Sequence, residues 1–149
     1  MLRLTRRSEY GLMAMAYLAG RAPSYTSVRE IGDRLNIPRR LLAEVLKDLS
    51  RGGLVEGARG PGGGYRLLGG AGQIALGKVV EVLEGPIQVA DCSDGGCCEH
   101  ESACIIQTGM RFVASRIKKV LDESTLADLV MEAPAARGAA TPVTLRMPV

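Results

Sequence analysis

The sequence predicts a mainly α-helical protein built around a winged helix-turn-helix, with a long helix and a cysteine-bearing loop in its second half. Three observations predict this class. Apolar residues recur at three- and four-residue spacing over most of the chain, which is typical of helices with one buried face. A glycine-rich stretch, 59–64, lies between two short strand-like runs, as in a hairpin. All four cysteines and the single histidine fall within residues 91–104, where almost nothing is apolar.

The composition fits one domain with appendages. At 149 residues the chain can bury a core without disulfides, and because only 3% of its residues are aromatic, that core has to be aliphatic. The first ten residues lead into an amphipathic helix, not an apolar signal sequence, and no apolar run approaches the roughly 20 residues of a membrane span. We therefore expect a cytoplasmic protein with no membrane partner, whose reduced thiols act as metal ligands or redox groups.

The charge is unevenly distributed along the chain. Residues 1–66 hold 12 Lys and Arg against 6 Asp and Glu, a net charge of +6, whereas residues 67–149 hold 7 against 10, a net charge of −3. A basic N-terminal half predicts a polyanionic partner for that half. An ordinary solvated surface can carry the same charge, so the net charge alone does not distinguish the two interpretations.

Three helices are expected in the first half. The spacing predicts a helix over 6–21. A second, short helix follows Ser27, which forms a capping box with Glu30. After a tight turn, Pro38 suits the first position of a third helix that runs to about Ser50.

The second and third helices form a helix-turn-helix, in which the third can lie in the DNA major groove with its first turn at the base edges. Arg39 and Arg40 open that helix and can reach guanine or phosphate. Lys47 and Arg51 are better placed for phosphate. Helix pairs of this kind also occur in proteins that never touch DNA, so the motif alone leaves both interpretations open.

A hairpin with strands at 54–58 and 65–68 predicts a wing after the helix-turn-helix. Its glycine-rich tip lets the backbone approach DNA closely, and arginines beside it gain from the negative potential of the minor groove. A phosphate loop would need a helix after the glycines, and a merely flexible turn does not explain the flanking arginines. The residues expected at DNA are Ser27, Arg39, Arg40, Lys47, Arg51, Arg59, Gly60, Pro61, Gly62, Tyr65 and Arg66.

The second half is expected to begin with a helix over 74–83 and to contain a long helix from Cys104 to about Asp122. A stripe of apolar residues runs along the long helix, and because the winged helix has already closed its own core, the same helix of a second chain is the simplest partner. A homodimer would place two third helices about one turn of DNA apart, on a palindromic operator. The stripe comprises Ile105, Ile106, Met110, Val113, Ile117, Val120 and Leu121.

These elements divide the chain into four parts. We expect a winged helix-turn-helix DNA-binding domain over 1–84, a cysteine-rich iron–sulfur loop over 85–104, a dimerisation helix with a short final helix over 105–132, and a mobile tail over 133–149.

The cysteine spacing favours an iron–sulfur cluster over zinc. Cys92, Cys98 and Cys104 are evenly spaced, with five residues between neighbours, and Cys97 lies beside Cys98. Zinc sites usually pair their ligands as C-x-x-C, which is absent here. Evenly spaced thiolates on a glycine-rich loop suit a larger centre. Cys97 and Cys98 are not both expected to bind, and either could be the middle ligand.

The Arg3-Leu4-Thr5 start, the Gly53–Val55 and Arg59–Tyr65 phrases GLV and RGPGGGY, and the cysteine loop together resemble one known family. Over roughly residues 2–132 the sequence is similar to the bacterial winged-helix regulators that include IscR, NsrR and RirA. The resemblance implies a dimeric DNA-binding transcription regulator, not an enzyme, that often holds an iron–sulfur cluster. No nucleophile with a plausible histidine base competes with this interpretation.

The resemblance also implies a ligand set. The three ligand cysteines of the family match Cys92, Cys98 and Cys104, and a [4Fe-4S] cluster is preferred to a [2Fe-2S] cluster. The IscR-like fourth ligand, a histidine, is replaced here by Gln107. The NsrR-like ligand, an acidic residue of the partner's first helix, matches Glu9.

Two alternatives to a ligating Glu9 stay open. Glu9 also fits an ordinary helix-start carboxylate that favours the helix dipole, and His100 within the loop is the other candidate ligand. A carboxylate is a labile ligand for iron, which suits a sensor of nitric oxide, oxygen, redox state or iron–sulfur status.

The hypothesis is a repressor whose cysteine loop is tied to the long helix while the cluster is present. Loss of the cluster would shift the two recognition helices of the dimer relative to each other on the operator. The alternatives are a regulator of the same fold that uses thiol oxidation or zinc, and a redox or metal carrier.

Overall fold

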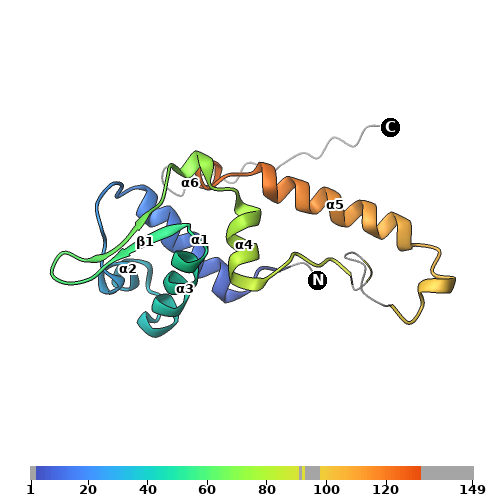
Figure 1. The fold of residues 1–149 in the computed structure, drawn as a ribbon, viewed down its shortest axis with the longest axis horizontal. Coiled ribbons are helices and arrows are strands. Elements are labelled where there is room, and N and C mark those ends of the chain that lie inside the picture. The colour runs from blue at the N-terminus through green and yellow to red at the C-terminus, as the bar shows by residue number, and fades with distance from the viewer. Residues whose placement is uncertain (1–2, 91, 93–97, 132–149) are drawn as a thin grey trace, which may run out of the picture.

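The computed structural model describes residues 3–90, 92 and 98–131, and it confirms a mainly helical winged helix-turn-helix (Figure 1). The residues of the expected tail, 133–149, lie outside this range. Among the described helices, none has both the length and the apolar character that a membrane crossing requires. The elements are α1 (Arg6–Ala19), α2 (Val28–Leu35), α3 (Arg39–Arg51), β1 (Val55–Ala58), β2 (Gly64–Leu67), the 3-10 turn η1 (Ala71–Gln73), α4 (Leu76–Glu84), the 3-10 turn η2 (Glu101–Ala103), α5 (Gln107–Glu123) and α6 (Leu126–Met131).

Helix α1 lies at the centre of the winged helix, where it contacts α2, α3, α4, α6 and β2. Its buried face carries Ala14, Met15 and Leu18, which are almost completely inaccessible. Thr5 caps its N-terminus by accepting a hydrogen bond from Ser8 N at 3.3 Å. The helix ends at Ala19, two residues earlier than the sequence predicted.

The helix-turn-helix is formed by α2 and α3, but the expected capping box is only half present. Ser27 Oγ accepts from Glu30 N at 3.1 Å, as predicted. The carboxylate of Glu30 does not return to Ser27, because it pairs with Arg21 at 2.7 Å and accepts from the Tyr17 hydroxyl at 3.2 Å. Pro38 is the residue before α3 and not its first residue.

The antiparallel strands β1 and β2 form the wing, with Val55 opposite Leu67 and Ala58 opposite Gly64. The base of the wing is held by a third segment that the sequence did not reveal. Thr26 and Tyr65 exchange two backbone hydrogen bonds of 2.9 Å each, which joins β2 to the residues before α2. The wing and the helix-turn-helix are therefore one unit.

Helix α4 begins at Leu76, two residues later than predicted, because the chain before it pairs with the segment before α6. Leu76 N donates to Ser124 O at 2.8 Å and Leu126 N donates to Ile74 O at 2.9 Å. Leu126 is fully buried, and α6 contacts α1 and η1. The short last helix is thus packed into the core of the winged helix.

Helix α5 leaves the winged helix as a long arm that contacts α4 near its C-terminal end (Figure 1). None of its described residues is buried, although Phe112, Val113 and Val120 are large and apolar. A groove of about 690 Å³ runs between α5, the end of α4 and the segment that follows α4.

Gly64 tests the attachment of the wing. It has a φ of 144°, and a Cβ there would lie 2.1 Å from Thr26 O, whereas Gly62 has a φ of 73° with open space around it. Gly62→Ala should cost about 1–2 kcal/mol of unfolding free energy for the left-handed backbone. Gly64→Ala should cost more, because the backbone of Thr26 must also move, and urea denaturation measures both. Equal costs would show that the Thr26–Tyr65 junction does not hold the wing.

Candidate nucleic-acid interface and cysteine site

One face of α3 is exposed along the whole helix and carries three of the six cations expected at DNA. Arg40, Glu44, Lys47 and Arg51 lie on it, with the small Ala43 between the first two. The opposite face carries the buried Leu42, Val45, Leu46 and Leu49. Because these four side chains fix the rotation of α3, the exposed face points away from the body of the protein.

A groove of about 500 Å³ separates α3 from the wing, and it is lined by Lys47, Arg51 and Arg59. Three cations at one concave surface suit a phosphate backbone. Gly60, Pro61 and Gly62 form the exposed tip of the wing beyond this groove. The structure thus places Lys47 and Arg51 of α3 and Arg59 of the wing around one groove.

Four of the expected DNA-binding arginines form ion pairs within the chain. Arg40 and Arg51 pair within α3 itself, whereas Arg39 and Arg66 connect different elements. Arg39 Nη2 donates to both carboxylate oxygens of Asp33, at 2.8 and 3.1 Å. Arg66 Nε donates to Glu56 Oε2 at 2.7 Å, and its guanidinium lies 4.7 Å from the centre of the Tyr25 ring. Whether these residues also touch DNA stays a prediction.

Tyr25, Glu56 and Arg66 join the base of the wing to the segment before α2. Hydrogen bonds from Arg66 and from the Tyr25 hydroxyl stabilise the Glu56 carboxylate and hold its pKa below the usual range. The same contacts with Glu56 raise the pKa of Tyr25 and of Arg66. Two other residues predicted to bind DNA have structural roles, since Ser27 caps α2 and Tyr65 pairs with Thr26.

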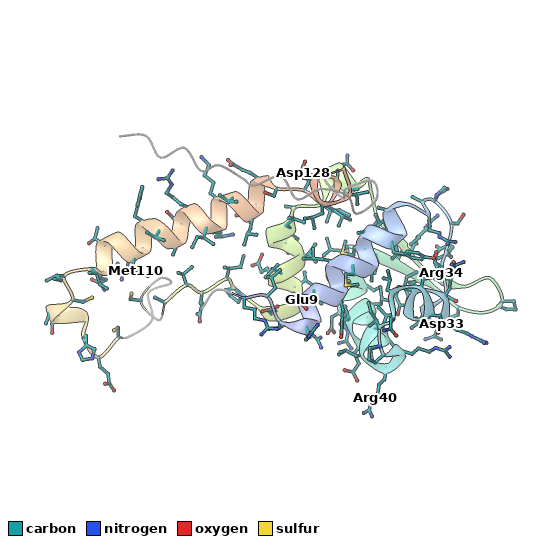
Figure 2. All side chains as sticks on the ribbon, turned by 180° about the vertical axis from the view of Figure 1, so that it is seen from behind. Glu9, Asp33, Arg34, Arg40, Met110 and Asp128 are labelled. Carbon is teal, nitrogen blue, oxygen red and sulfur yellow. The ribbon has the colours of Figure 1, made fainter. Side chains whose placement is uncertain are left out.

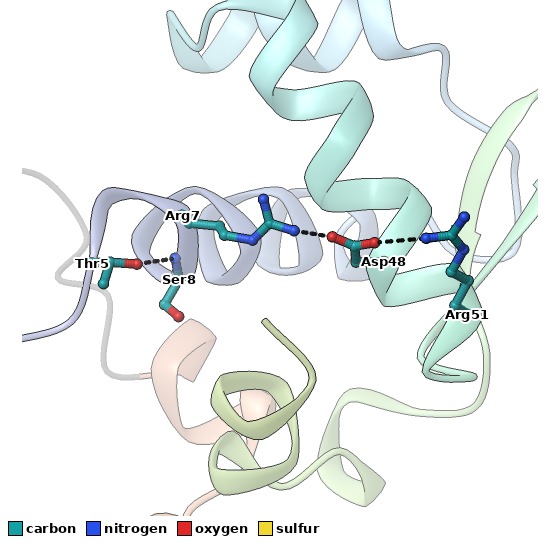
Figure 3. Close-up of polar contacts among 5 residues, drawn as sticks. All are labelled: Thr5, Arg7, Ser8, Asp48 and Arg51. Atoms are coloured by element: carbon teal, nitrogen blue, oxygen red, sulfur yellow. Dashed lines mark hydrogen bonds and ion pairs between the residues drawn. The ribbon is translucent and has the colours of Figure 1, made fainter. Parts of the chain in front are cut away.

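Asp48 on α3 forms ion pairs on both sides (Figure 3). Arg7 of α1 contacts one of its carboxylate oxygens, and Arg51 Nη1 lies 3.4 Å from the other. The pair between Arg7 and Asp48 is partly buried, so it fixes α3 against the N-terminal part of α1 more firmly than a surface pair would.

The cysteine site is only partly within the described residues. Cys92 is buried and Cys98 and Cys104 are half-buried, all three as free thiols, while Cys97 lies outside the described range. Arg111 of α5 donates from Nε to Cys92 O at 3.0 Å, which fastens the start of the loop to the long helix. Among the described residues, no three potential ligand side chains come together as a metal site.

The candidate fourth ligands lie in different places. Glu9 is on α1, where it pairs with Arg6 at 3.5 Å, and Figure 2 shows it well separated from Met110 at the start of α5. His100 is exposed beside η2, and Gln107 is the first residue of α5. Within one chain Glu9 is therefore remote from the cysteine end of the arm.

Glu84 has a role that the sequence analysis missed. It accepts from Thr5 N at 3.1 Å and from Thr5 Oγ1 at 2.8 Å, which connects the end of α4 to the start of α1. Burial would raise the pKa of Glu84, but the hydroxyls of Ser8 and Thr5 and the Thr5 N–H outweigh it and lower the pKa. The partners are 79 residues apart, so no local pattern could have revealed the contact.

A family model described as "Rrf2: Iron-dependent Transcriptional regulator" matches residues 4–132. The chain belongs to this family. It is similar to the HTH-type transcriptional regulator IscR of Vibrio campbellii, with 31% identity over 132 residues, which are 88% of this chain and 79% of the relative. As an Rrf2-family protein it is a DNA-binding transcriptional regulator and not an enzyme, as the sequence predicted.

Solved structures of the family have the same fold. CymR of B. subtilis, named the global cysteine regulator, superposes with a TM-score of 0.75 at 32% identity, covering 90% of this chain and all of that one. IscR of T. potens superposes with a TM-score of 0.71 at 28% identity and covers 94% of both chains. The similar solved structures thus include both a protein named IscR and a cysteine regulator.

Acid should weaken the attachment of the wing through Glu56. Because the pKa of Glu56 is lower in the folded than in the unfolded chain, its contribution to stability is present above the ordinary value of 4.5 and is lost as the pH falls through the folded value. Glu56→Gln should therefore lower the urea midpoint near pH 7 and approach the wild type in acid.

The matched control is Glu123→Gln, which removes an exposed ion pair with Lys119 on α5. It should change the midpoint little at any pH. A constant gap between Glu56→Gln and wild type from pH 7 to pH 3 would refute the role of the carboxylate.

Proposed function

We propose that this protein is a homodimeric repressor whose affinity for a palindromic operator depends on an iron–sulfur cluster held by Cys92, Cys98 and Cys104. The observation that carries the proposal is the course of the chain around α5. Its cysteine end holds Cys92 through Arg111, and its other end leads into α6, which packs on α1 in the core that carries α3. A change at the cysteines therefore has a packed route to the DNA-binding face.

The donor set fits a sulfur-ligated iron centre. Three thiols lie on a single segment, and the segment between Cys92 and Cys98 contains two glycines that can fold around a larger centre. Such a cluster supplies a redox- and nitric-oxide-reactive group. The [4Fe-4S] form is preferred, with Glu9 or His100 as candidates for a fourth, labile ligand.

A dimer through α5 is supported by its uncovered apolar surface. Phe112, Val113, Ile117 and Val120 line the groove of about 690 Å³ together with residues that follow α4. Exposed apolar surface of this extent needs a partner, and an identical helix related by two-fold symmetry is the simplest one. Since Glu9 is remote from the cysteine end of its own chain, any bond from Glu9 to the cluster would come from the second subunit.

Two-fold symmetry also determines the form of the operator. Two α3 helices facing the same side of DNA would read half-sites about one helical turn apart. Regulation follows if the arrangement of the two arms sets the spacing of the two α3 helices, because a palindrome is bound tightly only when both halves fit. The cytoplasmic location stays a prediction that accords with DNA as the partner.

Thiol chemistry without a cluster is a second candidate, and it is favoured by the structural neighbours. One solved relative is described as the oxidized form of Staphylococcus aureus CymR and superposes with a TM-score of 0.69 at 25% identity. Cys97, adjacent to Cys98, gives this chain an additional thiol for such a mechanism. Zinc binding at the cysteines is a third candidate. A redox or metal carrier is disfavoured because the family consists of transcriptional regulators.

Anaerobic purification separates these candidates. The cluster proposal expects brown protein with iron and sulfide in about equal amounts. Cys92→Ser, Cys98→Ser and Cys104→Ser should each lose iron and change operator affinity, while Cys97→Ser, the neighbouring control, should keep both. Colourless protein that contains zinc, or that lacks metal and forms a disulfide, would replace the proposal with one of the alternatives.

Glu9 is tested in the same preparations. Glu9→Ala should retain the three thiolates but lose iron faster when nitric oxide or oxygen is admitted, as judged from the visible spectrum. Arg6→Ala is the control, because it removes the ion pair with Glu9 and leaves the carboxylate. Identical loss rates for wild type and Glu9→Ala would remove Glu9 from the ligand set.

The dimer is tested on α5. Val120 is 61% exposed, so Val120→Asp should leave the fold of the subunit intact but introduce a charge into the proposed interface. Sedimentation velocity should then show monomers where the wild type is a dimer. The adjacent Lys119→Gln should stay dimeric, and a dimeric Val120→Asp would place the interface elsewhere.

A further inference from the structure

The first two turns of α3 present Arg39, Arg40 and the carboxylate of Glu44 to the outside. Arg40 is the most exposed ion-pair partner of the DNA-binding face, with 95% of its side chain accessible, and it extends from the edge of the molecule in Figure 2. Glu44, one turn later, is 56% exposed. Arg40 Nε and Glu44 Oε1 are 3.7 Å apart, a loose pair that either side chain can leave at little cost.

Arg39 differs from its neighbour in this respect. Its guanidinium donates to both oxygens of Asp33 in α2, and Asp33 Oδ2 also lies 3.8 Å from Arg29 Nε. Two hydrogen bonds to a carboxylate hold Arg39 across the helix-turn-helix. Arg40 is therefore the arginine of this helix start that can turn to a base without breaking contacts between helices.

A carboxylate on this face requires a specific explanation. The surface meets a polyanion, so Glu44 opposes binding unless it accepts a hydrogen bond from the DNA. In the major groove cytosine N4 and adenine N6 are donors, and cytosine N4 is the usual partner of Glu because adenine also presents the N7 acceptor. Guanine and thymine present acceptors at the corresponding edge. Because the Glu44 carboxylate is repelled by a base that presents only acceptors, it lowers the affinity for the wrong sequence and so adds specificity.

We propose that Arg40 and Glu44 together read neighbouring base pairs in each half-site, with Arg40 on a guanine and Glu44 on the amino group of a cytosine. Four residues of helix rise about 6 Å, and stacked base pairs are about 3.4 Å apart, so the two side chains reach positions one or two steps apart. Ala43 lies on the same face and is small enough to let the helix backbone approach the groove.

This inference rests on the DNA binding in the proposed function, and it is independent of the cluster. The test is selection from randomised duplex DNA, followed by affinity measurements on the selected site. Anaerobically purified and metal-free full-length protein are both used. The variants are Arg39→Ala, Arg40→Ala, Arg40→Lys, Glu44→Gln and, as a control on the same face, Lys47→Ala.

Arg40→Ala should lose the guanine preference at one position of each half-site, a loss of about 5- to 150-fold in discrimination. Arg40→Lys should weaken that preference less, because an ammonium can still donate to guanine O6 and N7. Glu44→Gln should change the neighbouring preference from cytosine to adenine, because an amide can pair with the adenine N6 and N7 edge. Lys47→Ala should weaken all sequences similarly and reduce the salt dependence by about one ion per subunit.

The inference is overturned if Glu44→Gln and Arg40→Ala select the wild-type sequence, or if Arg39→Ala is the change that removes the guanine. In either case the wild type still selects a site, so the proposed function stands. If the wild type selects no sequence in either form, the proposed function and the inference fail together.

Discussion

The packing of α1 in an aliphatic core is the interaction on which the rest of the structure depends. The helices α2, α3, α4 and α6 and the strand β2 all contact it, around Ala14, Met15 and Leu18. Among the described residues the fully buried side chains of this core are non-aromatic, and Tyr10, Tyr17 and Tyr65 pack only at its edge. Close packing of this kind is not easily deformed, so a displacement of α1 moves the elements that bear on it.

Polar contacts reinforce the same helix at its N-terminal end. Arg7 pairs with Asp48 on α3, and Thr5 binds Glu84 at the end of α4. Glu9 lies half a turn from Arg7 on the same helix. Under the proposed function, binding or loss of a ligand at Glu9 would act on α3 through contacts that already exist in the subunit.

The arm formed by α5 separates the described cysteines from the DNA-binding helices. It holds Cys92 through Arg111 at one end, and at the other it leads through the Ile74–Leu126 junction into the core. The fold is shared with proteins named IscR and CymR, so the architecture itself does not decide between a cluster and a thiol switch. In this chain, whether a cluster or a thiol switch operates depends on which side chains near the cysteines can bind a metal.

The sequence by itself determined the helices, the wing and the family, because apolar periodicity, glycine at a hairpin tip and short motifs are local patterns. The ligand role of the cysteines stays a prediction. The sequence could not determine the exact ends of α1 and α4, the pairing of Thr26 with Tyr65, or the packing of α6. It also assigned Arg39 and Arg66 to DNA without revealing Asp33 and Glu56 as their partners. Only the tertiary structure decided these points, because each depends on a contact between segments whose separation along the chain carries no periodic signal.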